Sequence, residues 1–368
     1  MSARLASAGR MLGHWIADRV LPYWERFVRR SRIRRLMFDY QNRRTFADLI
    51  QHDRMLADEA RVKAYWAAIE KHIGPDDVVL DLGTGTGVLT AFAAQRCAQV
   101  HALDHGPIIE AAEAVVRDNA LTNVKFHRKH SRNLELDRKV DVILHEQLGN
   151  AVFDEHVVAN IADLRDRLLA EGGRIYPSRL DMYIEPVQLR DDSRAPFSWQ
   201  QKLHGVDFRE LRHYGERQLK HHHYRYRVMR PFPFSHFLSE PEPVVSIDLG
   251  TVGPDGLPTR IAFEREVTTP GFVDGYCVYF DAYFDDELWF TSSPAVPATN
   301  WGIPLLRVEG PRVEVGQRLD FSLAALDLAD PESWSWNVEV VAGSQPLALD
   351  LDVQTSSDAE GDAASVSA

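Results

Sequence analysis

Two different patterns of hydrophobic positions divide the chain near Pro177. Before Pro177, short apolar runs alternate with amphipathic helical stretches, as in residues 140–144 followed by residues 157–169. We expect Gly172 and Gly173 to end that helix, because glycine readily adopts the left-handed conformation found after helix C-termini. Strands that alternate with helices form a doubly wound sheet, so this half is predicted to be an α/β domain.

After Pro177, apolar and polar positions alternate over short runs, which is the two-residue period of β-strands. The predicted strands are residues 180–189, 244–249, 260–267, 276–284, 318–326 and 334–341. This half is therefore predicted to be an antiparallel sandwich or barrel. Residues 195–235, rich in His and Arg, interrupt the strands. Within them, residues 221–223 are all histidine, and we expect an exposed loop or strand edge there, because three consecutive side chains cannot all face one metal ion.

The two ends of the chain have opposite character. In residues 1–35, apolar side chains recur at helical spacing beside nine arginines, which predicts a basic amphipathic helix interrupted near Pro22. We expect this helix to pack on its own domain, and docking on a membrane surface or a partner is the alternative. From Val353 onward, small, polar and acidic residues predict a disordered tail.

The composition limits the class of protein. With 368 residues, 45% of them hydrophobic, the chain can form two domains with real cores. A net charge of -12 argues against a general nucleic-acid binder. The two cysteines, Cys97 and Cys277, argue against a disulfide framework and favour a reducing cytoplasm. We expect neither a membrane span nor a signal peptide, since no apolar run has the required length or flanks.

A glycine-rich segment follows the first predicted strand. Residues 78–87 read V-V-L-D-L-G-T-G-T-G, with glycine at Gly83, Gly85 and Gly87. Glycine permits a tight turn with positive φ and lets the backbone approach a ligand. A dinucleotide site favours G-x-G-x-x-G, whereas these glycines fall as G-x-G-x-G with Asp81 just before them. This pattern resembles motif I of class I S-adenosylmethionine (SAM) methyltransferases, where an acidic residue suits the ammonium group of the cofactor.

The next apolar segment ends in an acidic residue, Asp104, seventeen positions after Gly87. A carboxylate in this place can accept hydrogen bonds from both hydroxyls of a ribose. The glycine loop and Asp104 together predict a site for a nucleoside-containing cofactor.

Two glutamates, Glu146 and Glu155, lie in the segment H-E-Q-L-G-N-A-V-F-D-E. Glu146 is expected at the carboxyl end of a sheet strand, where open α/β sheets bind ligands, and Gly149 allows the loop to return Glu155 toward it. Two converging carboxylates repel each other unless a cation lies between them. Guanidinium is planar and permanently charged and pairs well with carboxylates. The pair predicts a guanidinium site, with a surface loop of two solvated glutamates as the alternative.

With these motifs in place, residues 51–341 resemble the protein arginine methyltransferases. That family joins a SAM-binding domain to a β-barrel and carries a double-glutamate loop. Residues 52–56 and 58–61 look like its segment before motif I, and residues 175–177 like its join to the barrel. Residues 291–294 and 297–301 look like its T-H-W loop, which closes the arginine pocket.

The resemblance implies a role for each matched residue. Glu146 and Glu155 would hold the acceptor guanidinium as the catalytic pair. Arg61 would bind the carboxylate of SAM, and Met55 would lie near its methyl group. Asn300 and Trp301 would line the acceptor pocket. The implied cofactor-binding set is His52, Arg61, Asp81, Gly83, Gly85, Gly87, Asp104 and Ser131. No residue is assigned to a metal.

The chain departs from the family pattern mainly near the acceptor. Asn300 stands where most members have histidine, and asparagine cannot take up a proton near neutral pH. Residues 42–46 occupy the place of an aromatic lid helix, and residues 147–148 replace the usual Trp-Met pair. Residues 131–133 stand where an acidic residue normally contacts adenine. The cofactor motifs survive better than the acceptor motifs, as expected for a methyltransferase with an unusual acceptor.

The sequence therefore predicts a SAM-dependent N-methyltransferase acting on arginine in a protein or peptide. Two alternatives stay open: methylation of a small cationic metabolite, and a SAM-binding scaffold without turnover. The predicted organisation is a basic helix over residues 1–36, a Rossmann-like SAM domain over 37–176, an antiparallel β-barrel over 177–352 and a tail over 353–368. The resemblance also implies a homodimer, with an arm in residues 195–235, and the composition implies a cytoplasmic location.

Overall fold

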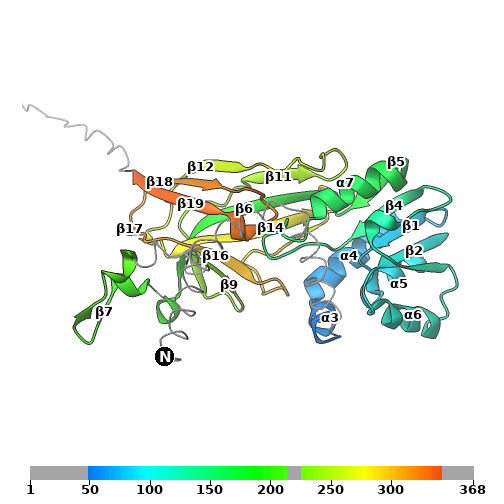
Figure 1. Cartoon of the computed structure of the whole chain (residues 1–368), viewed down its shortest axis with the longest axis horizontal. Coiled ribbons are helices and arrows are strands. Elements are labelled where there is room, and N and C mark those ends of the chain that lie inside the picture. Colours follow the sequence, from blue (N-terminus) through cyan, green and yellow to red (C-terminus); the bar gives the residue numbers. More distant parts are fainter. Residues whose placement is uncertain (1–48, 195, 214–224, 342–368) are drawn as a thin grey trace, which may run out of the picture.

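The computed structural model describes residues 49–194, 196–213 and 225–341. In Figure 1 this part of the chain is elongated, with an α/β domain at one end and β-strands at the other. The predicted N-terminal helix, residues 42–46, the histidine run 221–223 and the acidic tail lie outside the described residues.

The α/β domain contains a five-stranded parallel sheet in the order β3-β2-β1-β4-β5. Its strands are β1 (Val78–Leu82), β2 (Gln99–Asp104), β3 (Val124–Arg128), β4 (Val140–His145) and β5 (Leu169–Tyr176). Every residue of the central strand β1 is buried, as expected when helices cover a parallel sheet. The strand order reverses between β1 and β4, so their carboxyl ends form the crevice in which such sheets bind ligands.

Five helices accompany this sheet and confirm the predicted alternation. Within the described residues they are α3 (Leu49–Leu56), α4 (Glu59–His72), α5 (Val88–Ala94), α6 (Ile109–Asp118) and α7 (Val157–Leu168). Helix α4 begins at Asp58, whose side chain accepts a hydrogen bond from the backbone N–H of Arg61 at 3.3 Å. This cap fixes the end of α4 that points toward the site.

The predicted end of α7 is wrong. The helix stops at Leu168, because Leu169 already has extended backbone angles (φ -80°, ψ 135°) and begins β5. Gly172 and Gly173 therefore lie within β5. A Cβ atom at Gly173 would come within 2.6 Å of Leu169 Cδ1, so this glycine makes room for a neighbouring side chain instead of ending the helix.

The other half is built from antiparallel strands, and all six predicted strands are present with small shifts at their ends. One seven-stranded sheet runs β10-β6-β14-β16-β9, with β11 on β6 and β15 on β14. Its bounds are β6 (Arg179–Leu189), β9 (Tyr226–Met229), β10 (Phe234–Phe237), β11 (Val245–Asp248), β14 (Gly275–Tyr283), β15 (Trp289–Thr291) and β16 (Ile303–Arg307). A three-stranded sheet contains β12 (Arg260–Glu266), β18 (Arg318–Ala324) and β19 (Ser335–Val341). The curled sheet fits the predicted β-barrel class.

The segment that interrupts these strands is shorter than its sequence suggested. Strand β9 falls inside residues 195–235 and β10 begins there, but both belong to the seven-stranded sheet. Each has four residues, too few to show a clear period of two. Before the undescribed residues, the segment forms a small hairpin of β7 (Lys202–Leu203) and β8 (Val206–Asp207).

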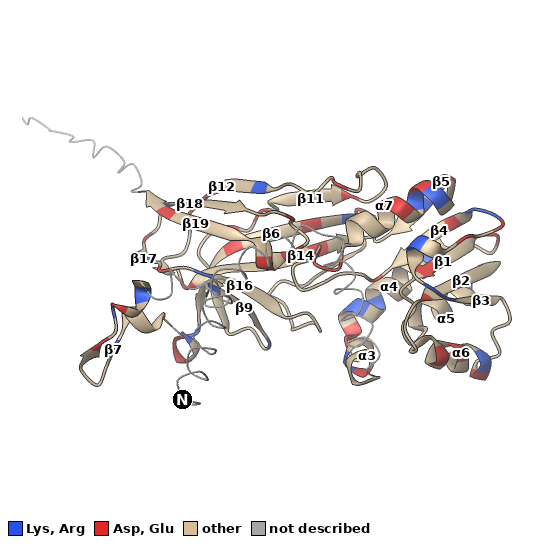
Figure 2. Ribbon diagram, viewed as in Figure 1, with Lys and Arg blue, Asp and Glu red and all other residues tan. Residues whose placement is uncertain are grey.

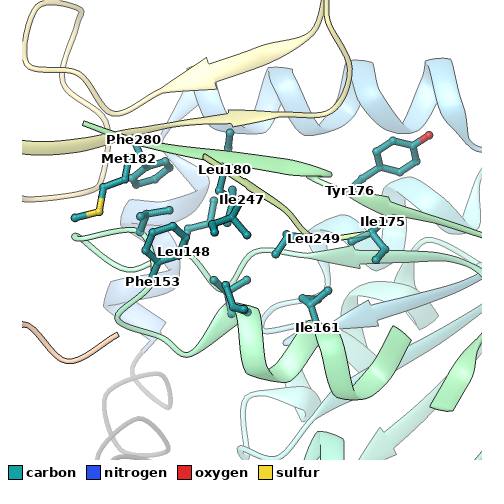
Figure 3. Packing of buried hydrophobic residues seen from close by; sticks show 14 of the residues in the cluster. Leu148, Phe153, Ile161, Ile175, Tyr176, Leu180, Met182, Ile247, Leu249 and Phe280 are labelled. Carbon is teal, nitrogen blue, oxygen red and sulfur yellow. The ribbon is translucent and has the colours of Figure 1, made fainter. Parts of the chain in front are cut away.

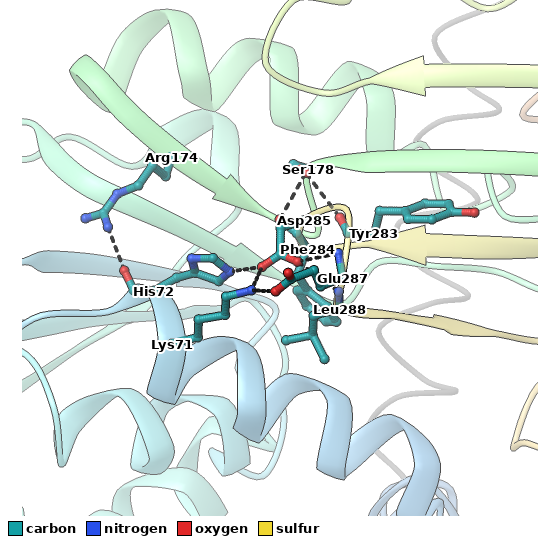
Figure 4. A network of polar contacts seen from close by, with 9 residues as sticks. All are labelled: Lys71, His72, Arg174, Ser178, Tyr283, Phe284, Asp285, Glu287 and Leu288. Carbon is teal, nitrogen blue, oxygen red and sulfur yellow. Dashed lines mark hydrogen bonds and ion pairs between the residues drawn. The ribbon is translucent and has the colours of Figure 1, made fainter.

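One hydrophobic core runs through both halves. Figure 3 shows Leu148 and Phe153 of the α/β domain beside Met182 and Phe280 of the large β-sheet, all members of one buried cluster. A polar network also crosses the junction (Figure 4), where Asp285 Oδ2 accepts from Lys71 Nζ at 2.9 Å. The two halves therefore pack as one body around the edge that carries the candidate site.

Two further features concern the whole described part of the chain. Cys97 and Cys277 are both free thiols and both buried. Within residues 49–194, 196–213 and 225–341, none of the helices combines the length and apolar character needed to cross a bilayer.

Candidate active site

The glycine loop has the geometry that its sequence predicts. Gly83, Gly85 and Gly87 have φ angles of 77°, 54° and 86°, a region that L-residues with side chains rarely adopt. A Cβ atom on Gly85 would lie 2.8 Å from His52 Cε1, so this glycine lets His52 close over the loop. A Cβ atom on Gly87 would lie 2.9 Å from Ala112 Cβ, so Gly87 allows α5 to pack against α6.

The two aspartates beside the loop have different positions. Asp104 Oδ2 accepts from the backbone N–H of Gly85 at 3.1 Å, which ties the end of β2 to the loop. Asp81 is buried and accepts a hydrogen bond from Thr90 Oγ1 at 2.6 Å, which ties β1 to α5. Burial raises the pKa of Asp81 to about 6. Asp81 thus lies behind the loop, whereas the sequence suggested a position near the ammonium group of the cofactor.

A pocket opens between this loop and helices α3 and α4. It brings together several residues that are far apart in sequence. Its lining includes the predicted site residues His52, Met55, Arg61, Gly83, Gly85 and Glu146. Leu89 and Phe92 of α5 add an apolar wall. The segment before motif I, the glycine loop and the first glutamate therefore share one cavity.

The central contact of the pocket is an ion pair. Arg61 Nη1 lies 3.1 Å from Glu146 Oε2, and the two side chains are only 8% and 21% exposed. Arg61 also donates through Nη2 to the backbone carbonyl of Met55. The sequence assigned Arg61 to the cofactor and Glu146 to the acceptor. In the structure both side chains line the same pocket, and Glu146 binds the guanidinium of Arg61.

The second glutamate, Glu155, lies in the loop that follows Glu146. The loop folds back through a β-bridge between Gly149 and Val152. Burial raises the pKa of Glu155 well above 4.5, and the charge of Glu146 raises it further. Burial also raises the pKa of Glu146, with Arg61 acting in the opposite direction. Both carboxyl groups are therefore in surroundings that disfavour their ionised forms.

The loop of the β-domain that follows β15 holds the glutamate loop in place. Trp301 Nε1 donates to the carbonyl of Leu148 at 2.5 Å, and the backbone N–H of Gly302 donates to Asn150 Oδ1 at 2.7 Å. These two hydrogen bonds connect the β-domain loop to the glutamate loop and hold it in position.

Asn300 is held from both sides. Its backbone N–H donates to Asp58 Oδ2 at 2.7 Å, and its side-chain Oδ1 accepts from Arg230 Nη1 at 3.0 Å. Asp58 therefore caps α4 and binds the β-domain loop with the same carboxylate. Asn300 is positioned by two residues to which the sequence gave no role.

Sequence reasoning also missed Tyr65, which lines the pocket and donates to the carbonyl of His145 at 2.8 Å. The available signals were modest. Asp58 is a good N-cap residue before an amphipathic stretch, and Tyr65 lies one turn after Arg61 on the same helix face.

Ser131 is not placed in the pocket lining. It begins the short 3₁₀ helix η1 (Ser131–Asn133), and its carbonyl accepts from Arg167 Nη2 at 3.0 Å. Across the part of the chain that the structure describes, no group of three or more His, Cys, Asp or Glu side chains is arranged to hold a metal ion.

The pocket suits a cofactor that carries a nucleoside and an amino-acid group. The glycine backbone leaves a cradle that a side chain on Gly85 would fill, because His52 lies directly across it. Asp104 stands at the loop with a carboxylate for ribose hydroxyls, and Arg61 offers a guanidinium for a carboxylate. The fold and this site define a SAM-dependent methyltransferase.

Two family models match the chain. A "Methyltransferase domain" model covers residues 73–214, and an "Arginine methyltransferase oligomerization subdomain" model covers residues 178–310. Together the two matches support a member of the protein arginine methyltransferase family, with SAM as its cofactor.

Curated relatives have names that agree with this assignment. The chain is 29% identical over 284 residues to protein arginine N-methyltransferase 6 of Danio rerio, covering 74% of this chain and 80% of that protein. It is also 29% identical over 328 residues to a probable protein arginine N-methyltransferase 6 of Arabidopsis thaliana, covering 86% of this chain and 73% of that protein.

Solved structures share the fold. The Trypanosoma brucei PRMT1 enzyme-prozyme complex with AdoHcy aligns with a TM-score of 0.68 and 24% identity, covering 80% of this chain and 94% of that one. Arabidopsis thaliana protein arginine methyltransferase 10 aligns with a TM-score of 0.67 and 24% identity, covering 81% and 95%.

Proposed function

We propose that this protein transfers the methyl group of SAM to a guanidinium nitrogen of arginine in other proteins. The observation that carries the proposal is the contact of Glu146 with the guanidinium of Arg61, and the raised pKa of Glu155 in the same loop adds to it. We infer that these carboxyls form a guanidinium-binding position, since Glu146 lines the cofactor pocket. The names of the relatives, protein arginine N-methyltransferases, support the same acceptor.

The side chains act mainly by binding and orientation. SAM supplies an electrophilic methyl group when it is bound. Glu146 and Glu155 hold the acceptor guanidinium by charge-assisted hydrogen bonds and fix the direction of the reacting nitrogen. Because the site is partly closed to water, their negative charges act more strongly than they would in solvent.

The transferred methyl group leaves one proton to be removed from the acceptor nitrogen. Free guanidinium stays protonated, with a pKa above ~12, so the proton leaves as the new N–C bond forms. Asn300 has no basic atom for this step, and its Oδ1 already accepts from Arg230. We assign the proton to the glutamate pair, in particular to Glu155, whose raised pKa makes it the better proton acceptor.

The decisive test is methyl transfer from labelled SAM into a host-cell lysate separated into protein and small-molecule fractions. We expect label in protein that is released on hydrolysis as methylarginine. The label should be lost in Glu146→Gln and retained in Glu264→Gln, a change of the same type at an exposed position on β12.

The other outcomes identify the alternatives. Label confined to the small-molecule fraction would make the acceptor a cationic metabolite. Measurable SAM binding without label in either fraction would favour a scaffold role.

We propose in addition that the protein is a homodimer. The match to an oligomerization subdomain over residues 178–310 supports this, as do two apolar side chains at the β7–β8 hairpin, Leu203 and Val206, which are 47% and 57% exposed. Such side chains are suited to an interface with a second copy.

We also propose a cytoplasmic location, supported by the two free, buried cysteines. Fractionation of the native host should recover the protein with soluble markers. Recovery in a salt-washed membrane pellet would contradict this and would favour membrane contact by the predicted N-terminal helix.

A further inference from the structure

Two exposed arginines lie at the edge of the candidate active site. Arg54 is in the last turn of α3, directly before Met55, which lines the pocket. Arg230 follows β9 of the large β-sheet, and its Nη1 donates to Asn300 at 3.0 Å. The two side chains therefore come from opposite halves of the molecule, one next to the pocket residue Met55 in the helix and the other bound to the Asn300 loop.

Arg230 is held in place by a chain of contacts that leads to the reaction site. Arg230 binds the side chain of Asn300, whose backbone binds Asp58. Asp58 caps the helix that carries Arg61, and Arg61 pairs with Glu146. Asn300, which replaces the usual histidine, thus fixes a cation at the entrance.

The two arginines are close enough to affect each other. Loss of solvent lowers the pKa of Arg230, the charge of Arg54 lowers it further, and Asp58 acts in the opposite direction. Within the described ranges, neither Arg54 nor Arg230 forms an ion pair with an acidic side chain. Figure 2 shows both acidic and basic positions on α3 and α4, the two helices that border the pocket.

This arrangement favours one positive charge in the site and disfavours further positive charges next to it. The glutamate pair attracts a guanidinium. Arg54 and Arg230, here called the rim, repel further positive charge beside it. A substrate segment with several arginines or lysines meets that repulsion. A segment with a carboxylate next to its arginine satisfies the glutamates and the rim together.

Building on the proposed function, we infer that Arg54 and Arg230 select acceptors in which the target arginine is flanked by an acidic residue. They select against acceptors with flanking Lys or Arg. The substrate class is thus an arginine in an acidic or mixed-charge segment.

The test uses three peptides of equal length, each with one arginine flanked by Asp, Gln or Lys. We expect kcat/KM to be about ten-fold higher for the Asp peptide than for the Lys peptide at low salt, since each exposed charge pair contributes a few-fold. The ratio should shrink as salt shortens the Debye length below ~8 Å. In the Arg54→Gln/Arg230→Gln double variant the ratio of kcat/KM for the Asp and Lys peptides should approach one. In the Arg54→Glu/Arg230→Glu double variant the Lys peptide should become the better substrate.

The control is Arg312→Gln on β17 (Arg312–Val313), which also replaces an exposed arginine by glutamine but lies away from the pocket. It should keep the wild-type ratio of kcat/KM for the Asp and Lys peptides. Binding of the same peptides to the full-length protein saturated with S-adenosylhomocysteine separates charge selection from turnover. Tighter binding of the Asp peptide without any methyl transfer would support charge selection by Arg54 and Arg230 and would contradict the proposed function. Equal binding and equal turnover of all three peptides, a preference for the Lys peptide, or no binding of any peptide would overturn the inference.

Discussion

At the scale of single residues, the proposed mechanism depends on two partly buried carboxyl groups, those of Glu146 and Glu155. Glu155 has its pKa raised by burial, by Glu146 and by Asp154, and only Arg61 acts against these effects. A guanidinium that enters between the glutamates offsets the repulsion and favours their ionised forms. Acceptor binding and proton release from the pair are therefore linked.

A pH dependence follows from this linkage. We expect kcat/KM for the acceptor to rise with pH along a limb whose apparent pKa lies well above 4.5, because the ionised pair binds the cation. Glu155→Gln should lower kcat by about a hundredfold or more and remove that limb. Steady-state methyl transfer from the acidic to the neutral range checks this. A flat wild-type profile would contradict the role of Glu155.

Buried His145 gives a second residue-scale prediction, for stability. Its Nε2 lies 3.0 Å from the carbonyl of Pro177, and burial lowers its pKa from 6.5 to about 4. The unfolded chain therefore binds a proton that the folded chain does not. Folding stability should fall as pH drops from about 6.5 to about 4, by up to about 3 kcal/mol. Below that range His145 adds no further loss.

Urea unfolding at a series of pH values measures this effect. Because His101 also has a pKa lowered to about 4, the comparison is with His145→Gln. That variant should lose part of the pH dependence of its unfolding free energy. Parallel curves for the two proteins would show that His145 does not contribute.

At the scale of elements, the glutamate loop between β4 and α7 is positioned by a loop from the other half of the molecule. Trp301 and Gly302 each bind its backbone or side chains, and Asn300 binds the cap of α4. The β-domain therefore shapes the catalytic loop even where its side chains do not line the pocket.

Trp301→Phe tests this connection, since it removes the N–H donor to Leu148 and keeps most of the ring. We expect kcat/KM for the acceptor to fall about ten-fold, with SAM affinity nearly unchanged, because a misplaced loop affects the acceptor side. Trp289→Phe, at a half-exposed position on β15, is the control and should behave as wild type. An equal loss of SAM affinity in Trp301→Phe would contradict a positioning role.

At the scale of the whole molecule, the two halves share one apolar core and the polar network around Asp285. Since neither half can keep that core buried alone, we expect one cooperative transition in calorimetry. Two well-separated transitions would show that the halves unfold independently.

The proposed dimer is tested at the hairpin. Leu203→Asp/Val206→Asp should raise the dimer dissociation constant by ten-fold or more, because burying each apolar side chain contributes roughly 1.5–3 kcal/mol. Sedimentation measurements check this, with exposed Val315→Asp as the matched control. An unchanged dimer would place the interface elsewhere.

The sequence predicted local features well. The longer β-strands were found because alternation of period two is a local property, and the glycine loop because its φ angles demand glycine. The strands β9 and β10 were missed because four residues are too few to show a period of two. The predicted end of α7 was wrong because packing against Leu169 decides the place of Gly173.

The sequence by itself determined the α/β-plus-β architecture, the SAM-binding loop and the pair of glutamates, because each is written in adjacent or regularly spaced residues. Only the tertiary structure decided that Arg61 pairs with Glu146, that Asp81 lies behind the loop and that Arg230 reaches Asn300 at the entrance. Those contacts join side chains from separate elements, up to 242 positions apart for Asp58 and Asn300. Their partners are chosen by the packing of the two halves, which no local pattern specifies.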